Sequence, residues 1–491
     1  MNIDIFDNDL FSIQEARILS EKAKEAQSIL STYSQKTLDD IVLSMANKIL
    51  FFLKELSYSS WEETDYGNWE DKYIKNKFIC EYVLESIKDM KCVGIIKNDE
   101  EKKIIDIGIP IGVIAALCPV TSPVSTVIYK ALIGIKSGNA VIFSPHPRAK
   151  HTIAKALDIL IEAGMESGLP EDALSYMKTV TKSGTRELIN HKAVSMIMNT
   201  GVMSLLKDCY NSGKPLIFGG VGSGPAFVER TADLKEASKN IIMSKTFDYG
   251  IVPASEQSVV VDKVVEKDFR KEFIESGAYF MSKEESESLG KVIYKENGSL
   301  NPMAVGKSPQ ILAKKSGFTV GENVKILVSE EKYVSETNPY SKEKLCPVLS
   351  YYIEEDWQNA CVKCIELLLT ERYGHTLVIH SKNPFVIEQF ALKKPVGRIL
   401  VNSPATYGSL GMTTNLFPSM TLGSGSAGKG ITSDNVSPMN LIYIRKIGYE
   451  VKDVMSVREK YKVKENIEIS KLNSEQIDKI VEKILGSLKS K

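Results

Sequence analysis

The stretch IGVIAALCPVTSPVSTVIYKALIGIKSGNAVIFSPHP, residues 111–147, decides the fold. Its first seven residues form an apolar run that predicts a buried strand, and a turn follows at 118–123. The residues after the turn carry apolar side chains at helical spacing, and a second apolar run at 140–144 predicts the next strand. Strand, helix and strand in this order predict a parallel βαβ unit.

The same alternation continues to residue 218. We expect a helix at 151–167, followed by strands at 175–180, 193–198 and 215–218 with helices between them. This order predicts a doubly wound α/β sheet, which binds ligands at the carboxyl ends of its strands. The turns expected at that edge are 118–123, 144–148, 199–202 and 219–225.

A second α/β section is expected from 227 to 417, and SKTFDYGIVPASEQSVVV at 244–261 is central to it. This stretch predicts a helix that ends near Phe247, a short turn, and a strand from Ser258 to Val261. Such a junction places Pro253 at the end of a sheet, where the catalytic groups of α/β enzymes are usually located. The side chain of proline has no reactive atom.

Composition excludes several classes of protein. The 491 residues include 62 Lys and Arg against 62 Asp and Glu, so no net charge favours nucleic acid or an anionic membrane. The longest apolar run, 111–120, is too short to span a bilayer, and the N-terminus lacks the pattern of a secretory signal. Seven irregularly spaced cysteines indicate reduced thiols and a cytoplasmic location. Cys361 and Cys364 fit an apolar helix face better than a zinc site.

The remaining segments have simpler patterns. Two N-terminal helices are expected at 12–30 and 37–56, and a β-hairpin at 92–108. A Gly-rich and Ser-rich loop or lid is expected at 406–432, followed by a strand-like arm that ends near residue 449. Beyond 450 the chain is charged and weakly patterned, which is typical of a linker.

The C-terminal residues 473–491 predict a short amphipathic helix. Its apolar side chains follow helical spacing along one stripe: Ile477, Ile480, Val481, Ile484, Leu485 and Leu488. Two interpretations stay open, namely packing against the protein's own body and docking of the helix on a partner protein.

Several motifs together resemble the CoA-acylating members of the aldehyde dehydrogenase superfamily. They are SIQEAR (12–17), IFSPHPRAK (142–150), ERTADLK (229–235), MSKTFDYG (243–250), ASEQSVVV (254–261), EKLCPV (343–348), GHTLVIHS (374–381) and TSDNVSPMNLI (432–442). The chain is most similar to the acetaldehyde and propionaldehyde enzymes of anaerobic bacteria, including those of bacterial microcompartments.

The resemblance implies an aldehyde dehydrogenase-like α/β fold of two Rossmann-like parallel-sheet domains and a homo-oligomer. It implies an NAD-binding domain at 1–226, a catalytic domain at 227–417, a lid and oligomerisation arm at 418–449, a linker at 450–472 and a docking helix at 473–491. The implied reaction converts a short-chain aldehyde, CoA and NAD (or NADP) to acyl-CoA. A Cys thiolate attacks the aldehyde, and a backbone N–H and an Asn side chain hold the resulting oxyanion.

The resemblance also implies positions for the cofactors. The turn with Ser144, His146 and Pro147 would meet the adenosine of NAD or CoA, and Glu343 would hold the nicotinamide ribose. His375 would lie near the cleft. The remaining cofactor positions are Thr200, Gly201 and Gly220. No metal site is implied.

The reacting positions depart from the family pattern. Pro253 stands where the family has its nucleophilic Cys, and Ser122 stands at the oxyanion Asn. The other departures are Val202 in the T-G-G turn, Ser223 in G-N-x-P and Ser424 in L-G-C-G. Proline also lacks the N–H that the oxyanion hole would use. Loss of one such donor typically costs about 10²–10³ in rate.

Two functional hypotheses follow. One is an acylating dehydrogenase with an altered site whose activity is absent or very weak, and Cys118 is then the candidate substitute thiol. The other is a pseudoenzyme that binds nucleotide or assembles with an active paralogue. The helix at 474–488 resembles the helices that tether such enzymes inside microcompartment shells.

Overall fold

The computed structural model describes residues 7–222, 224–371, 374–462 and 472–489. The chain divides into two compact units. The first comprises Met1–Ile96 and Ile107–Arg445, and the second comprises Lys97–Asp106 and Lys446–Lys491.

Four helices open the first unit: α1 (Asn8–Leu30), α2 (Gln35–Leu50), α3 (Leu53–Thr64) and α4 (Trp69–Ile87). Polar side chains start three of them by accepting backbone N–H groups: Asp7 for α1, Ser34 for α2 and Asn68 for α4. The helix expected at 12–30 is confirmed. The helix expected at 37–56 is divided in two, because α2 ends at Leu50 and α3 begins at Leu53.

A five-stranded parallel sheet has the order β5-β4-β3-β6-β7. Its strands are β3 (Val113–Leu117), β4 (Ala140–Ser144), β5 (Leu174–Tyr176), β6 (Val194–Thr200) and β7 (Leu216–Gly219). The connecting helices are α5 (Pro123–Lys136), α6 (Lys150–Glu166), α7 (Lys182–Asn190) and α8 (Leu206–Asn211). Every residue of β3 and β4 is buried, which explains their apolar runs. The doubly wound sheet is confirmed.

A seven-stranded parallel sheet has the order β10-β11-β12-β9-β8-β13-β14. Its strands are β8 (Pro225–Val228), β9 (Ser258–Asp262), β10 (Ala278–Phe280), β11 (Ile326–Glu330), β12 (Val348–Glu354), β13 (Thr376–His380) and β14 (Arg398–Val401). Its helices are α9 (Leu234–Thr246), α10 (Glu266–Glu275), α11 (Lys283–Ile293), α12 (Pro309–Lys315), α13 (Trp357–Thr370), α14 (Pro384–Lys393) and α15 (Ala405–Ser409).

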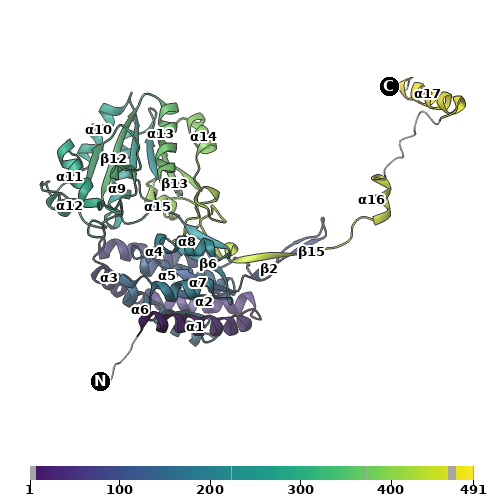
Figure 1. Ribbon diagram of the computed structural model, residues 1–491, viewed down its shortest axis with the longest axis horizontal. Coiled ribbons are helices and arrows are strands. Elements are labelled where there is room, and N and C mark those ends of the chain that lie inside the picture. The colour runs from purple at the N-terminus through teal and green to yellow at the C-terminus, as the bar shows by residue number, and fades with distance from the viewer. Residues whose placement is uncertain (1–6, 223, 372–373, 463–471, 490–491) are drawn as a thin grey trace. The chain divides into compact units, whose positions relative to one another are not determined.

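Helices cover both faces of this sheet (Figure 1), and an apolar cluster packs on each face. Residues of α9 and α10 pack on one face, and residues of α13 and α14 pack on the other. Cys361 and Cys364 belong to the second cluster, so the interpretation of C-x-x-C as an apolar helix face is confirmed.

The expected hairpin at 92–108 is confirmed as β1 (Gly94–Asp99) and β2 (Ile104–Pro110). A three-stranded sheet has the order β1-β2-β15, where β15 is Ile442–Gly448. Within the segment expected as a linker at 450–472, Asp453 caps the short helix α16 (Val454–Lys460). Residues 463–471 of that segment lie outside the described residues.

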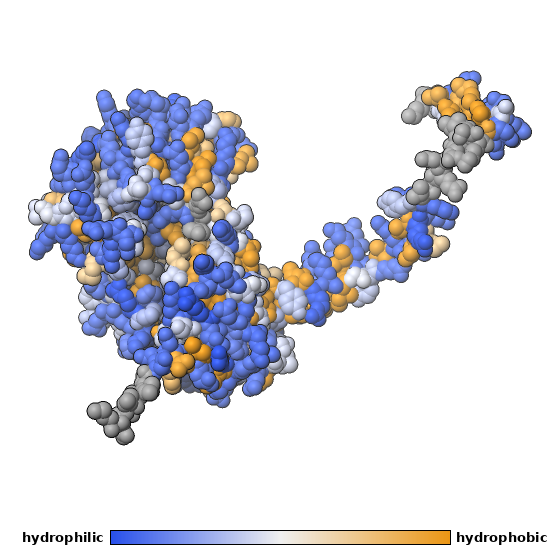
Figure 2. All heavy atoms as spheres, in the orientation of Figure 1, coloured by the Kyte–Doolittle hydropathy of each residue, from blue (hydrophilic) through white to orange (hydrophobic). Residues whose placement is uncertain are grey.

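The C-terminal amphipathic helix is α17 (Ser474–Lys489), and none of its residues is buried. Its apolar side chains gather along one side (Figure 2). In the described parts of the chain, no helix has both the length and the apolar character that crossing a bilayer requires.

Candidate functional site

A cavity of about 250 Å³ lies where the two large sheets face each other. The turns that follow β3, β4, β6 and β7 line one side, and the segments that precede β9, β12 and β13 line the other. The cavity therefore meets the carboxyl ends of the five-stranded sheet and the amino ends of the seven-stranded sheet. Strand order reverses beside β3, which is the usual ligand position in a doubly wound sheet.

Most of the predicted site residues meet at this cavity. The lining includes Ser122, His146, Thr200, Gly201, Gly220, Pro253, Glu343 and His375. Ser144, Pro147 and Cys118 are not among the lining residues. The Ser144 hydroxyl is instead 2.9 Å from the Thr185 hydroxyl, in the interior of the sheet domain.

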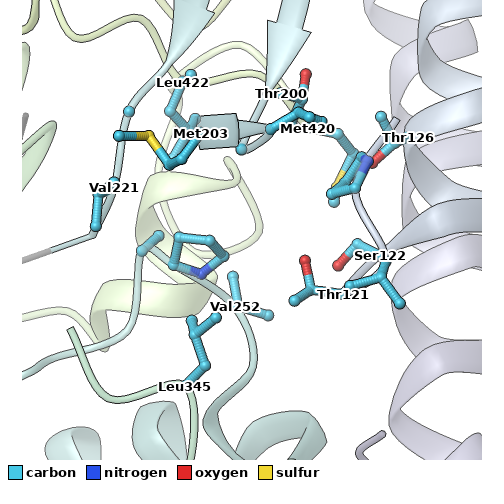
Figure 3. Close-up of a pocket in the computed structure, with 18 of the residues that line it drawn as sticks. Thr121, Ser122, Thr126, Thr200, Met203, Val221, Val252, Leu345, Met420 and Leu422 are labelled. Carbon is cyan, nitrogen blue, oxygen red and sulfur yellow. The ribbon is translucent and has the colours of Figure 1, made fainter. Parts of the chain in front are cut away.

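The wall around Pro253 is mainly apolar. Val221, Val252, Leu345, Met420 and Leu422 contribute to it. The hydroxyl groups of Thr121 and Ser122 lie on the side opposite Val221 (Figure 3). The expected lid at 406–432 forms part of this wall and holds fully buried side chains such as Thr421.

Neither nearby thiol replaces the missing nucleophile at the cavity wall. Cys118 and Cys346 are both about 1% exposed, and neither lines the cavity. Burial raises the pKa of each thiol to about 11. A buried thiol with a raised pKa is a poor nucleophile because the thiolate is the reactive form.

Ser122 is held by a buried lysine. Lys75, from α4, donates from Nζ to the Ser122 Oγ at 2.8 Å and to the Asp248 Oδ2 at 2.9 Å. Lys72, one turn earlier on α4, also donates to the Asp248 carboxylate. Because Ser122 Oγ accepts from Lys75, its own proton is available to an acceptor in the cavity.

The backbone around Asp248 is strained to make this contact. Asp248 and Tyr249 both have φ of +50°, in the left-handed region. The Asp248 carboxylate also accepts the Asn68 N–H, and the Asp248 N–H donates to the Asp71 carboxylate. Strain of this kind, of order 1–3 kcal/mol per residue, persists where the surroundings fix it.

Glu343 reaches the loop before β8. Its Oε1 accepts the Gly222 N–H at 2.7 Å, and the Glu343 N–H donates to the Glu371 Oε2 at 2.8 Å. Burial and the neighbouring Glu371 carboxylate raise the pKa of Glu343 well above its ordinary value. A carboxyl group at this position can accept a hydrogen bond from a hydroxyl group of a bound sugar.

The two histidines of the cavity are held uncharged. Burial and the Arg398 guanidinium lower the pKa of His375 to about 3. Arg398 donates to the His375 carbonyl oxygen at 2.9 Å. Burial and Arg148 also lower the pKa of His146, whose Nδ1 accepts the Arg148 N–H. Both rings can therefore act as hydrogen-bond partners for a ligand.

The remaining departures from the family pattern differ in position. Val202 lines the cavity, and Asn199 fixes its loop by accepting the Val202 N–H and donating to the Val202 carbonyl oxygen. Ser424 is buried and donates to the Phe218 carbonyl oxygen. Ser223 lies outside the described residues.

Comparison with known proteins agrees with this geometry. Residues 11–297 match the profile of the aldehyde dehydrogenase family. A crystal structure of an acetylating aldehyde dehydrogenase from Geobacillus thermoglucosidasius is 42% identical, with a TM-score of 0.88 over 91% of this chain and 99% of that one. The chain belongs to the CoA-acylating aldehyde dehydrogenases. A probable aldehyde dehydrogenase from Listeria monocytogenes is 46% identical, with a TM-score of 0.90 over 92% of this chain and 100% of that chain.

A longer relative also matches. The bifunctional aldehyde-alcohol dehydrogenase AdhE of Escherichia coli is 38% identical over 436 residues, which are 88% of this chain and 49% of that protein. The chain therefore spans about half the length of the curated relatives of this type.

The motifs did not single out the lysine and aspartate behind Ser122. Lys72 and Lys75 are at most 2% exposed and share the buried face of α4 with Ile79. Lys72, Lys75 and Ile79 are spaced so that they share one face of a helix. Two basic residues on an apolar helix face were therefore the sequence signal that could have indicated a buried ion pair.

Proposed function

We propose that this acylating aldehyde dehydrogenase binds the nicotinamide and CoA groups of its family but does not form a covalent thiohemiacetal. The observation that carries the proposal is Pro253 at the cavity wall, with neither Cys118 nor Cys346 lining that cavity. Activity with short-chain aldehydes is then absent or very weak.

Cofactor binding is supported by residues that surround the cavity. Glu343 would accept a ribose hydroxyl, and the turns at His146 and at Thr200–Gly201 would hold the remainder of the dinucleotide. The dinucleotide, NAD or NADP, supplies a hydride acceptor when it is bound. Val202 lines the same cavity beside Gly201.

The test is NADH formation from NAD, CoA and acetaldehyde or propionaldehyde. The parent protein should form no NADH, and the double variant Pro253→Cys with Ser122→Asn should gain this activity. Calorimetry with NAD on the parent separates loss of chemistry from loss of binding. Turnover by the parent would contradict the proposal, and Cys118→Ser would then test the substitute thiol.

The pseudoenzyme hypothesis adds a partner. We propose that the chain assembles as a homo-oligomer or with a paralogue that carries the Cys. Copurification of a Cys-bearing paralogue from the source cells supports the second assembly, and a pure homo-oligomer contradicts it.

We also propose that α17 docks on a microcompartment shell or core protein. Its apolar side chains are exposed, as Val481 at 47% and Leu488 at 67% illustrate. An exposed stripe of this kind is typical of a helix that binds in a groove. Unchanged shell association after deletion of residues 450–491 would exclude this role.

A further inference from the structure

Lys394 and Cys361 make an unusually short contact between the helices that cover one face of the seven-stranded sheet. Lys394 follows the last residue of α14, and Cys361 lies on α13. The Nζ of Lys394 is 2.6 Å from the Sγ of Cys361 and 3.2 Å from the Cys361 carbonyl oxygen. The two residues are 8% and 5% exposed, respectively.

The distance does not fit a hydrogen bond to sulfur. The N–H···S contact from Asn199 to Cys209 is 3.7 Å, and the thiol of Cys80 lies 3.3 Å from the oxygen it donates to. The distance also exceeds a covalent bond to sulfur, since even an S–S bond is about 2.0 Å. An intermediate separation of this size is what one bridging atom produces.

The Lys394 side chain is buried against Cys361 and the Phe390 ring. The hydrogen bonds of Lys394 in the described part of the chain go to the carbonyl oxygen and the thiol of Cys361, and not to a carboxylate. Its ammonium instead lies over the Phe390 ring, 4.0 Å from the centroid. A buried charge without a carboxylate is costly, and covalent bridging would remove that charge.

We propose that Lys394 and Cys361 form an oxidative crosslink in which one oxygen atom joins Nζ to Sγ. A peroxide is the oxidant. One S–H and one N–H bond break, and one S–O and one O–N bond form. Sulfur and nitrogen each lose two electrons, which reduce two peroxide molecules. One oxygen stays in the bridge, three waters leave, and the ammonium first releases a proton to solvent. Sulfenic acid formation is the first rung of this chemistry.

The crosslink would join two segments that reach the cavity. Helix α13 leads to Glu371, which holds the Glu343 N–H, and Lys394 precedes Arg398, which holds the His375 carbonyl. A bond between these segments restricts the unfolded chain, as a disulfide does. We therefore expect the oxidised protein to melt at a higher temperature than the reduced protein.

The experiment treats the purified full chain with hydrogen peroxide, then digests it and measures peptide masses. A crosslinked pair should appear whose mass is the sum of the Cys361 and Lys394 peptides plus one oxygen and minus two hydrogens. Dithiothreitol should reverse it. Cys361→Ser and Lys394→Arg should each abolish it, whereas Cys364→Ser, one helical turn away, should retain it.

Three results would overturn the proposal. One is a Cys361–Cys364 disulfide, which carries no added oxygen and leaves Lys394 free. Another is a sulfenamide, which links the same residues but lacks the oxygen. The last is oxidation of Cys361 to an acid while Lys394 remains an unmodified amine. If Lys394→Arg fails to fold, the Cys361→Ser and Cys364→Ser pair still decides the question.

Discussion

The Nζ of Lys75 lies 2.8 Å from the Oγ of Ser122, at the position where the family pattern has an asparagine amide. Asp248 accepts from the same ammonium and is 0% exposed. The Nζ of Lys75 donates to both groups, so it offers no acceptor for the Ser122 proton. The geometry therefore makes Ser122 a hydrogen-bond donor to a ligand and not a nucleophile.

Removal of the Ser122 hydroxyl should weaken binding of an acyl-CoA. A hydrogen bond supported by a charge contributes about 1.5 kcal/mol, so Ser122→Ala should lower the affinity for acetyl-CoA about tenfold. Isothermal calorimetry measures this change. Ser125→Ala is the matched control because Ser125, in the first turn of α5, is buried but does not line the cavity. Equal affinities for parent and Ser122→Ala would exclude the role.

Asp248→Asn should destabilise the protein strongly. It would leave the buried ammonium groups of Lys72 and Lys75 without their carboxylate, at a cost of about 3–5 kcal/mol. Unfolding in guanidinium chloride measures the loss. Glu55→Gln, which removes an exposed pair with Lys155, should change stability by less than about 1 kcal/mol.

The contribution of Asp248 to the stability of the folded state should also depend on pH. Burial alone would raise the pKa of Asp248, but the ammonium groups of Lys72 and Lys75 lower it below its ordinary value. A depressed pKa stabilises the folded state above the pKa of the unfolded carboxyl, about 3.9, and this contribution is lost as the pH falls through the folded value. The gap between parent and Asp248→Asn should therefore narrow in acid. A constant gap would contradict the assignment.

The fold could be predicted from the sequence because buried parallel strands carry a strong signal. Apolar runs such as 113–117 and 140–144 are buried on both faces and read as strands without ambiguity. The short strand β8 was missed, because Pro225–Val228 follows a Gly-rich stretch and has too few residues to show a pattern. Helix α16 was missed because its exposed faces lack periodicity.

The site could be predicted only where a motif marks it. Glu343 and Pro253 come from segments far apart in the sequence, and their motifs placed both at the cavity. No motif identifies the roles of Lys75 and Asp248, because these roles depend on a contact between residues 173 positions apart. Only tertiary packing shows that an ammonium supports Ser122.

Gly222→Ala should disturb the loop beside Pro253. A Cβ at Gly222 would collide with the carbonyl oxygen of Pro253, which is backbone and cannot turn aside. Overpacking of this kind typically costs about 1–3 kcal/mol. Displacement of the loop would also break the hydrogen bond to Glu343, so NAD affinity should fall together with the melting temperature. Gly448→Ala is the control, because a Cβ there meets nothing within 4 Å. An unchanged melting temperature for Gly222→Ala would show that the loop is free to move.

Glu256→Gln should remove a pH dependence of stability near neutrality. Glu256 is 0% exposed, its Oε1 accepts the Ala405 N–H at 2.9 Å, and burial raises its pKa to about 7. The folded state therefore binds a proton more tightly than the unfolded state, whose carboxyl titrates near 4.3. This contribution is fully present below the unfolded pKa, and it is lost as the pH rises to about 7. Glutamine keeps the acceptor for Ala405 and has no proton to lose, so above neutral pH the free energy of unfolding of the variant should exceed that of the parent by about 3–4 kcal/mol. Unfolding free energies between pH 5 and about 8 measure the slope. Parallel curves for parent and Glu256→Gln would show that another group titrates in this range.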